Sequence, residues 1–432
     1  MKFGFVLAAI ALIVGAATTN TTSFQKQTAL NQPNVKAAVS VVPWYRTFIN
    51  RFLKTRKNIQ GINTRVVNLG QTIMVKPAVR DPKKWAPARC NDGTPFGFDL
   101  RRSTRGSNDW VLYLEGGAFC DDLAKPCSER TGRLTTTPPE ADGAVSSMKS
   151  DGIFSTDPTI NPTFSSANHV FARYCSSDGW SGATTARRPS TGDPTNGWYF
   201  SGRANVRAMV EILKASFGLD DTNAQTKVLF AGSSAGGIGV ETNADSIASL
   251  LPKTAKGGRF LLLDDGGFIP DFDDPTHRPG AFDGPIRDLI AKNYAFWGSR
   301  LNPPCEKANT GNPGRCFLSA VVYPYLTQPS PNGLGLPVFI QYSSIDKFSL
   351  DLHSIDNPKD PSDAQALETF RNTSLDSFAG ISWVFSGGAQ PYHTILTSPT
   401  GWTYGETGNT FREVLDRYWQ GATPQRVIFG NP

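Results

Sequence analysis

The sequence predicts an α/β domain with a mostly parallel sheet flanked by helices and interrupted by long loop and cap insertions. Apolar runs typical of buried strands alternate with helical patterns between residues 96 and 385. A chain of 432 residues is long enough to bury one large core with such insertions. Its hydrophobic content of 39%, with 41 glycines and 31 prolines, indicates a globular, loop-rich protein and not a fibrous one.

The N-terminus has the pattern of a secretory signal peptide over residues 1–17. A positive charge precedes a short apolar run that ends in small residues, and this run is too short for a comfortable transmembrane span. Residues 18–64 are expected to form a polar tail followed by an amphipathic segment. We therefore expect a secreted protein that does not span a membrane, with its catalytic domain in residues 65–432.

The six cysteines of an exported chain are disulfide candidates rather than metal ligands. Six cysteines allow fifteen pairings. Short separations favour Cys120–Cys127 and Cys305–Cys316, which leaves Cys90 for Cys175. No Cys-x-x-Cys occurs and only four histidines are present, so we expect no metal site and no cofactor.

The formal net charge of +6 and a pI near 8.9 make the chain mildly basic. An acidic polysaccharide or an anionic cell surface is a plausible neighbour for such a surface, although the charge also serves solubility. We expect no nucleic-acid partner, and we expect a monomer.

The body of the chain divides into strands and helices that follow one another. Strands are expected at residues 96–100, 110–115, 169–174, 228–231, 259–263, 337–342 and 381–385, and helices at 202–217, 239–251, 285–297 and 363–373. Residues 337–342 and 381–385 are expected to be the last two strands. The long Ser/Thr/Pro-rich connection at 121–166 is typical of a functional loop or lid. Residues 270–335 are expected to form a cap that the Cys305–Cys316 disulfide staples.

One serine lies at the centre of the strongest motif. The strand at 228–231 leads into Gly232–Ser233–Ser234–Ala235–Gly236, which is the Gly-x-Ser-x-Gly nucleophile elbow of an α/β-hydrolase-like fold. A side chain at Gly232 or Gly236 would collide with the neighbouring elements, and the apex residue Ser234 is strained. The spacing is not Gly-x-Gly-x-x-Gly, which counts against nucleotide binding. A tight loop without chemistry is the plainer alternative for this motif alone.

A second glycine-rich turn lies upstream of the elbow. The strand at 110–115 runs directly into Gly116 and Gly117. An α/β-hydrolase places half of its oxyanion hole at such a turn, because backbone N–H groups can face a developing O⁻ only where no bulky side chain intrudes. We expect the N–H groups of Gly117, Ala118 and Ala235 to form this hole.

The serine needs a histidine as its base, and the chain order Ser, Asp, His of this fold places that histidine after Ser234. His169 lies upstream and is excluded by this order. His277 falls in the Pro-rich cap, and His353 follows the penultimate strand, where the acid is expected. His393 follows the last expected strand and is therefore the predicted base.

The acid must orient that histidine. Asp346 lies four residues beyond the strand at 337–342 and is the predicted acid. Asp351 is the first alternative acid, and Asp264 or Asp265 is the second. Together Ser234, Asp346 and His393 predict ester hydrolysis through an acyl-enzyme.

Four segments, which include the elbow and the upstream glycine turn, carry a family resemblance. They are Cys90–Pro95, Leu114–Cys120, Tyr174–Gly182 and Ala231–Gly237. In this order they resemble the pectin acetylesterase and Notum family of secreted serine esterases, over roughly residues 90–397. The resemblance implies catalytic roles for Ser234, Asp346 and His393, oxyanion contacts from Gly117, Ala118 and Ala235, and the disulfides Cys90–Cys175 and Cys120–Cys127.

The same resemblance implies an acyl pocket, for which Phe119, Trp180 and Phe268 are candidates. Phe268 matches an aromatic residue of the family's pocket, although a core phenylalanine is the plainer explanation. Ala118 stands where Notum, which removes a palmitoleoyl group from Wnt proteins, carries a tryptophan that helps to wall the pocket. The expected substrate is therefore an ester on an acetylated polysaccharide or on an O-acylated protein. A catalytically silent secreted module that binds polyanions or lipids is the alternative, and the complete Ser–Asp–His set counts against it.

Overall fold

The structure is a computed structural model that describes residues 69–121, 127–130, 132–190, 193–272, 286–329, 333–353, 355, 360–387 and 392–429. All of these residues belong to one unit. The expected signal peptide (1–17) and tail (18–64), and also His277, lie outside the described residues.

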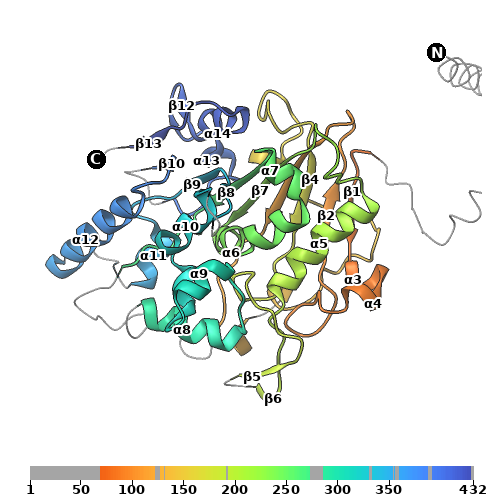
Figure 1. Cartoon of the computed structure of the whole chain (residues 1–432), viewed down its shortest axis with the longest axis horizontal. Coiled ribbons are helices and arrows are strands. Elements are labelled where there is room, and N and C mark those ends of the chain that lie inside the picture. The colour runs from red at the N-terminus through yellow and green to blue at the C-terminus, as the bar shows by residue number, and fades with distance from the viewer. Residues whose placement is uncertain are drawn as a thin grey trace, which may run out of the picture. The chain divides into compact units, whose positions relative to one another are not determined.

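A nine-stranded sheet forms the centre of this unit (Figure 1). Its strands lie in the order β1 (Thr72–Val75), β2 (Phe98–Arg101), β4 (Asn168–Ala172), β3 (Asp109–Leu114), β7 (Lys227–Ser233), β8 (Phe260–Asp265), β9 (Val338–Gln341), β10 (Trp383–Ser386) and β13 (Arg426–Ile428). Strand β2 runs antiparallel to both neighbours, and every other pair is parallel. The expected α/β-hydrolase-like fold with a mostly parallel sheet is thus confirmed.

The hydrophobic core has two layers, one on each face of the sheet. Successive side chains along a strand point to opposite faces and therefore join different layers. In β3, Trp110, Leu112 and Leu114 join one layer, whereas Val111 and Tyr113 join the other. The first layer is covered by α5 (Gly202–Ser216), α6 (Ala235–Leu250), α10 (Ser319–Thr327) and α12 (Pro361–Ser377), of which α5 and α6 lie in front of the sheet in Figure 1. The second is covered by α13 (Pro399–Trp402), α14 (Phe411–Gln420) and the 3₁₀ turn η3 (Gly152–Phe154).

Shorter elements complete the described chain. The remaining α-helices are α3 (Pro77–Arg80), α4 (Pro82–Trp85), α7 (Pro252–Lys256), α8 (Ile286–Trp297), α9 (Pro303–Ala308) and α11 (Lys347–Leu352). Further 3₁₀ turns are η1 (Cys127–Glu129), η2 (Gly132–Leu134) and η4 (Pro313–Phe317), and two hairpins pair β5 (Arg188–Ser190) with β6 (Asp193–Trp198) and β11 (Gly405–Glu406) with β12 (Asn409–Thr410). None of the described helices is long and apolar enough to cross a membrane.

Three expectations about local structure are wrong. Strand β10 is not the last strand, because β13 follows α14 and pairs with β10 at the edge of the sheet. Helix α6 begins at Ala235 and not at residue 239, since its first turn is built from the glycines of the elbow, which carry no helical pattern. The connection after residue 121 is not a lid along its whole length, because Ile153, Phe154 and Phe164 are buried under the second face of the sheet.

A third apolar cluster joins the helices of residues 286–327 to the rest of the unit. Leu289, Ile290 and Trp297 of α8 pack there with Phe317 and with Ile238 of α6. The indole N–H of Trp297 donates a hydrogen bond to the carbonyl oxygen of Cys120 at 2.8 Å. This segment therefore covers the start of α6, which directly follows the elbow.

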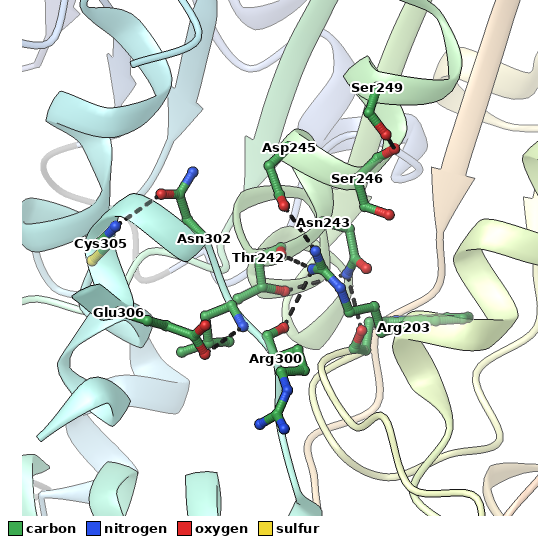
Figure 2. Close-up of polar contacts among 12 residues, drawn as sticks. Arg203, Thr242, Asn243, Asp245, Ser246, Ser249, Arg300, Asn302, Cys305 and Glu306 are labelled. Carbon is green, nitrogen blue, oxygen red and sulfur yellow. Dashed lines mark hydrogen bonds and ion pairs between the residues drawn. The ribbon is translucent and has the colours of Figure 1, made fainter. Parts of the chain in front are cut away.

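Polar contacts support the same junction (Figure 2). The guanidinium of Arg203 on α5 donates to the carbonyl oxygens of Thr242, at 2.7 Å, and Arg300, at 3.3 Å, and it forms an ion pair with Asp245 at 2.8 Å. One half-buried side chain thus links α5, α6 and the backbone just before α9. Hydrogen bonds to a charged donor are stronger than neutral ones, so this arginine fixes the position of the three segments.

Three disulfides join Cys90 to Cys175, Cys120 to Cys127 and Cys305 to Cys316, which are the pairs that sequence spacing favours. All six cysteines are buried. Cys90–Cys175 closes a sequence separation of 85 residues and Cys305–Cys316 one of 11 residues.

A disulfide stabilises mainly by restricting the unfolded chain, so the longer loop should contribute more. We expect the double variant Cys90→Ala/Cys175→Ala to lose about 4 to 5 kcal/mol of unfolding free energy, against about 3 kcal/mol for Cys305→Ala/Cys316→Ala. Urea denaturation of both variants beside the wild type measures the difference. A larger loss for the Cys305/Cys316 variant would contradict this account.

Candidate active site

Ser234 lies at the sharp turn between β7 and α6. Its backbone has φ 57° and ψ −124°, a conformation that is rare for a residue with a side chain. A Cβ atom on Gly232 would meet the backbone of Gly236, and one on Gly236 would meet the carbonyl of Leu114. Both glycines are therefore required by the close approach of β3, β7 and α6, as the elbow motif predicts.

His393 connects the serine with the predicted acid. Its Nε2 lies 2.8 Å from the Oγ of Ser234, and its Nδ1 lies 2.8 Å from Oδ2 of Asp346. Ser234 directly follows β7, whereas Asp346 and His393 lie in the connections after β9 and β10, and these strands are parallel and lie in the order β7, β8, β9, β10. The structure thus brings together the three residues that the sequence predicts, in the geometry in which a carboxylate orients a histidine base.

Neighbouring residues hold Asp346 and His393, the two partners of Ser234, in place. Asp346 is fully buried, and its Oδ1 accepts a hydrogen bond from the N–H of Ser349 at 2.8 Å, where the carboxylate caps α11. The ring of Phe348 stacks on His393 with a centroid distance of 4.8 Å. The histidine side chain is 27% exposed, so it faces an opening and not the core.

The turn after β3 presents its backbone beside the serine. Gly117 and Ala118 have φ values of 148° and 55°. Among the described residues, none accepts a hydrogen bond from the N–H of either. Arg130 donates to the carbonyl oxygens of Gly117, at 2.7 Å, and Phe119, at 3.5 Å. Because the arginine holds the carbonyls on one side of the turn, the N–H groups are left for a ligand.

A cavity opens at this point and is lined by both Ser234 and His393. Most of the side chains around it are apolar, and Asn293, Ser349 and His353 are its polar members. The apolar lining includes Ala118, Phe119, Ile238, Phe268, Ile269, Pro270, Leu289, Ile290, Trp297, Phe317 and Phe348. A site with this lining suits an acyl chain better than a sugar.

Two of the three predicted pocket residues line this cavity. Phe119 packs against Trp297 with ring centroids 5.4 Å apart, and Phe268 is 2% exposed and packs against Tyr342 at 5.1 Å. Trp180, the third, is not among the residues that line this cavity. Its side chain is fully buried, and its indole N–H donates to the carbonyl oxygen of Glu115 at 3.0 Å, which supports the turn after β3 from behind.

The other candidate bases and acids lie in different settings. His169 is buried in β4, and His353 lines the cavity with its ring 4.8 Å from that of Phe272. Asp351 pairs with Lys347 at 2.9 Å on the exposed side of α11. Asp264 is buried and accepts a hydrogen bond from the N–H of Gly267 at 2.7 Å.

Sequence reasoning missed Arg130 and Phe348. Arg130 lies three residues after Cys127 and carries no motif, so only its position in space reveals it. Phe348 lies two residues after Asp346, and an aromatic residue there has no pattern that distinguishes it from a core residue. Within the described residues, no group of three or more His, Cys, Asp or Glu side chains could hold a metal ion.

Known proteins are similar to this chain in sequence and in fold. The family model described as pectinacetylesterase matches residues 71–378. The palmitoleoyl-protein carboxylesterase notum1a of Danio rerio is 32% identical over 64% of this chain and 55% of its own length, and the palmitoleoyl-protein carboxylesterase NOTUM of Schmidtea mediterranea is 30% identical over 77% and 60%. The crystal structure of the Wnt deacylase Notum from Drosophila is similar with a TM-score of 0.68 and 25% identity, covering 83% of this chain and 96% of that one.

The parallel sheet, the elbow and the arrangement of Ser234, His393 and Asp346 define an α/β-hydrolase-like protein. The chain belongs to the pectinacetylesterase family, because the family model covers most of its length. It spans little more than half the length of the two relatives above. What those relatives act on is therefore evidence for a proposal and not a property of this chain.

The two aspartates that compete for the role of acid give a matched test. We expect Asp346→Asn to lower kcat for an ester by about 10³- to 10⁴-fold, because an amide cannot orient the histidine or stabilise its protonated form. Asp351→Asn removes only an exposed ion pair and should stay within twofold of the wild type. Steady-state hydrolysis of a p-nitrophenyl ester measures both. Equal activity of the two variants would refute the assignment of Asp346.

His169 should make folding sensitive to acid. Its Nδ1 accepts a hydrogen bond from Arg101 at 2.6 Å, and burial, together with the charge of Arg101, lowers its pKa to about 3 from 6.5. The unfolded chain therefore binds a proton first as the pH falls below 6.5, which removes stability from the folded state. We expect the wild type to lose about 3 kcal/mol more unfolding free energy than His169→Gln between pH 6.5 and pH 4, measured by urea denaturation. Parallel pH profiles would contradict this.

Proposed function

We propose that the chain is a carboxylic ester hydrolase that works through an acyl-enzyme on Ser234. The observation that carries the proposal is His393, whose two ring nitrogens lie 2.8 Å from the serine hydroxyl and 2.8 Å from the buried carboxylate of Asp346. A serine hydroxyl is a poor nucleophile until a base takes its proton, and this geometry supplies that base. Family membership and the names of the relatives agree with this chemistry.

In the first half of the reaction, Nε2 of His393 takes the proton of Ser234, and Oγ attacks the ester carbonyl carbon. The carbonyl oxygen becomes an oxyanion, which the N–H groups of Gly117, Ala118 and Ala235 stabilise. When the tetrahedral intermediate collapses, the ester C–O bond breaks and His393 gives its proton to the leaving alcohol. The acyl group remains on the serine, and Asp346 has stabilised the positive imidazolium throughout.

In the second half, water replaces the alcohol. His393 takes a proton from the water, whose oxygen attacks the acyl carbon and forms a second oxyanion in the same hole. Collapse of this intermediate breaks the bond to Ser234, which regains its proton from His393. The products are the free acid and the enzyme in its starting state, so the cycle needs no cofactor.

The apolar cavity supports an acyl group longer than acetyl. Each methylene that leaves water for an apolar site contributes about 0.8 kcal/mol. The lining includes aromatic residues from several segments, among them Phe119, Phe268 and Trp297. Ala118 also lines the cavity, and by the resemblance described above it stands where Notum carries a tryptophan that helps to wall the pocket, so this one difference counts against a long acyl chain. On the apolar lining and the relatives' names together, we favour an O-acylated protein over an acetylated polysaccharide.

Secretion, a monomeric state and contact with an acidic glycan belong to the same proposal. Three disulfides suit an oxidising location outside the cell. Arg187, Arg188 and Arg300 line one open cleft next to β5 and α8, where a polyanion would find several positive charges. The segment at 270–335 is proposed to act as the cap of the acyl cavity, since its described helix α8 supplies part of the lining.

A series of p-nitrophenyl esters from acetate to palmitate tests the reaction and the acyl preference together. We expect kcat/KM to rise by up to about fourfold per added methylene while the chain still enters the cavity, and then to level off. Ser234→Ala should abolish hydrolysis of every ester with an unchanged circular dichroism spectrum, because it removes the nucleophile.

Three outcomes count against the proposal. Full activity of Ser234→Ala would refute the acyl-enzyme on this serine. A preference for acetate that falls steadily with chain length would refute the long-chain assignment and favour the deacetylation of a polysaccharide. Complete inactivity of the wild type on all esters would favour the silent binding module.

A further inference from the structure

Asp265 is the last residue of β8. It is hydrogen-bonded both to the elbow around Ser234 and to the loop that carries His393. Its Oδ2 accepts a hydrogen bond from the hydroxyl of Ser233 at 2.5 Å, and its carbonyl oxygen accepts one from the N–H of Ser234 at 2.8 Å. The same carboxylate also accepts the N–H of Ile395 at 2.9 Å, through Oδ1, and the N–H of Leu396 at 3.1 Å, through Oδ2. One residue thus contacts the neighbour of the nucleophile, the nucleophile itself and the loop just after His393.

The loop that carries His393, here called the base loop, needs such an anchor. His393 lies on irregular backbone after β10, and loops open locally at lower free energy than strands. A catalytic constellation must be held to within about 0.5 Å, which a loop side chain cannot achieve alone. Ile395 and Leu396 are buried, so the two N–H groups that Asp265 accepts would lack partners without it.

Gly266, which directly follows the end of β8, supports the same contact by close packing. A Cβ atom on Gly266 would meet the carbonyl oxygen of His393, and this glycine has φ 73°. The backbone of His393 therefore rests directly on the end of β8. The two consecutive residues Asp265 and Gly266 fix the loop by hydrogen bonds and by contact.

We propose that Asp265 is a positioning residue that holds the His393 loop in register with the nucleophile elbow. It is not the acid of the triad, since Asp346 occupies Nδ1 of His393. It acts through the backbone of the base loop and through Ser233, and it touches no reacting atom. The proposal rests on the proposed ester hydrolysis, because positioning is measured through that reaction.

The charge of Asp265 strengthens these bonds. Burial raises its pKa to about 6, and its hydrogen bonds with Ile395, Ser233 and Leu396 oppose that rise. The carboxylate is therefore mostly ionised at neutral pH, and hydrogen bonds from N–H groups to an ionised acceptor are about twice as strong as neutral ones. An asparagine would keep the volume but would offer a single neutral oxygen acceptor.

The neighbouring Asp264 is a matched control. It is equally buried on the same strand, but its side chain contacts Gly267 and Glu241 and not the base loop. Burial and the nearby Glu241 raise its pKa well above the usual value. Asp264→Asn therefore changes a buried side chain that makes no hydrogen bond with the described part of the loop, whereas Asp265→Asn removes a charge that accepts hydrogen bonds from two N–H groups of that loop.

The test compares Asp265→Asn and Asp264→Asn with the wild type on the best p-nitrophenyl ester. Active serines are counted by titration with a fluorophosphonate, so that kcat refers to folded enzyme only. We expect Asp265→Asn to lower kcat per active serine by 10- to 100-fold with KM within twofold. The low-field proton NMR signal of the His393–Asp346 hydrogen bond should weaken or vanish in this variant, because the loop moves. Asp264→Asn should keep both kcat and that signal.

Several results would overturn the proposal. An Asp265→Asn variant with wild-type kcat per active serine and an unchanged NMR signal would do so. If this variant does not fold, Ser233→Ala decides, since it keeps the carboxylate and removes one of its donors. We expect Ser233→Ala to lower kcat two- to tenfold with unchanged KM, and wild-type kinetics would reject the proposal. A wild type without hydrolysis would instead reject the proposed function.

Discussion

The strained backbone of Ser234 is the constraint on which the rest of the site depends. A residue with φ 57° and ψ −124° persists only where its surroundings fix it. Here Gly232 and Gly236 let β3, β7 and α6 approach until no Cβ fits between them, and the N–H of Ser234 is bonded to Asp265. The parallel sheet supplies this geometry because the carboxyl ends of its central strands meet at one edge.

Each neighbouring strand then contributes one function at that edge. The turn after β3 presents N–H groups from which no described residue accepts a hydrogen bond, and Arg130 and Trp180 hold this turn. The turn after β9 carries the acid Asp346. The loop after β10 carries the base. Asp265 at the end of β8 and the adjacent Gly266 hold this loop in place. The site is therefore a property of five adjacent strand ends, and the helices at 286–327 add the apolar wall.

Much of this arrangement could be predicted from sequence, because the chemistry depends on short motifs. The elbow, the glycine turn and chain order single out Ser234, Asp346 and His393 before any comparison. Residues that act through space escape that reasoning. Trp180 lies in a family segment and yet packs behind the turn, Asp265 reads as an end-of-strand carboxylate, and β13 has only three partly exposed residues, too few for a strand pattern.

Transfer of the acyl group to Ser234 is the central step of the proposed reaction. Mass spectrometry of the protein after acid quenching during turnover of a p-nitrophenyl ester tests it most directly. We predict a mass increase equal to the acyl group, located on the peptide that contains Ser234 and absent from His393→Ala, in which the serine is not activated. An acyl group found on another residue, or rapid turnover without any acylated protein, would contradict the account.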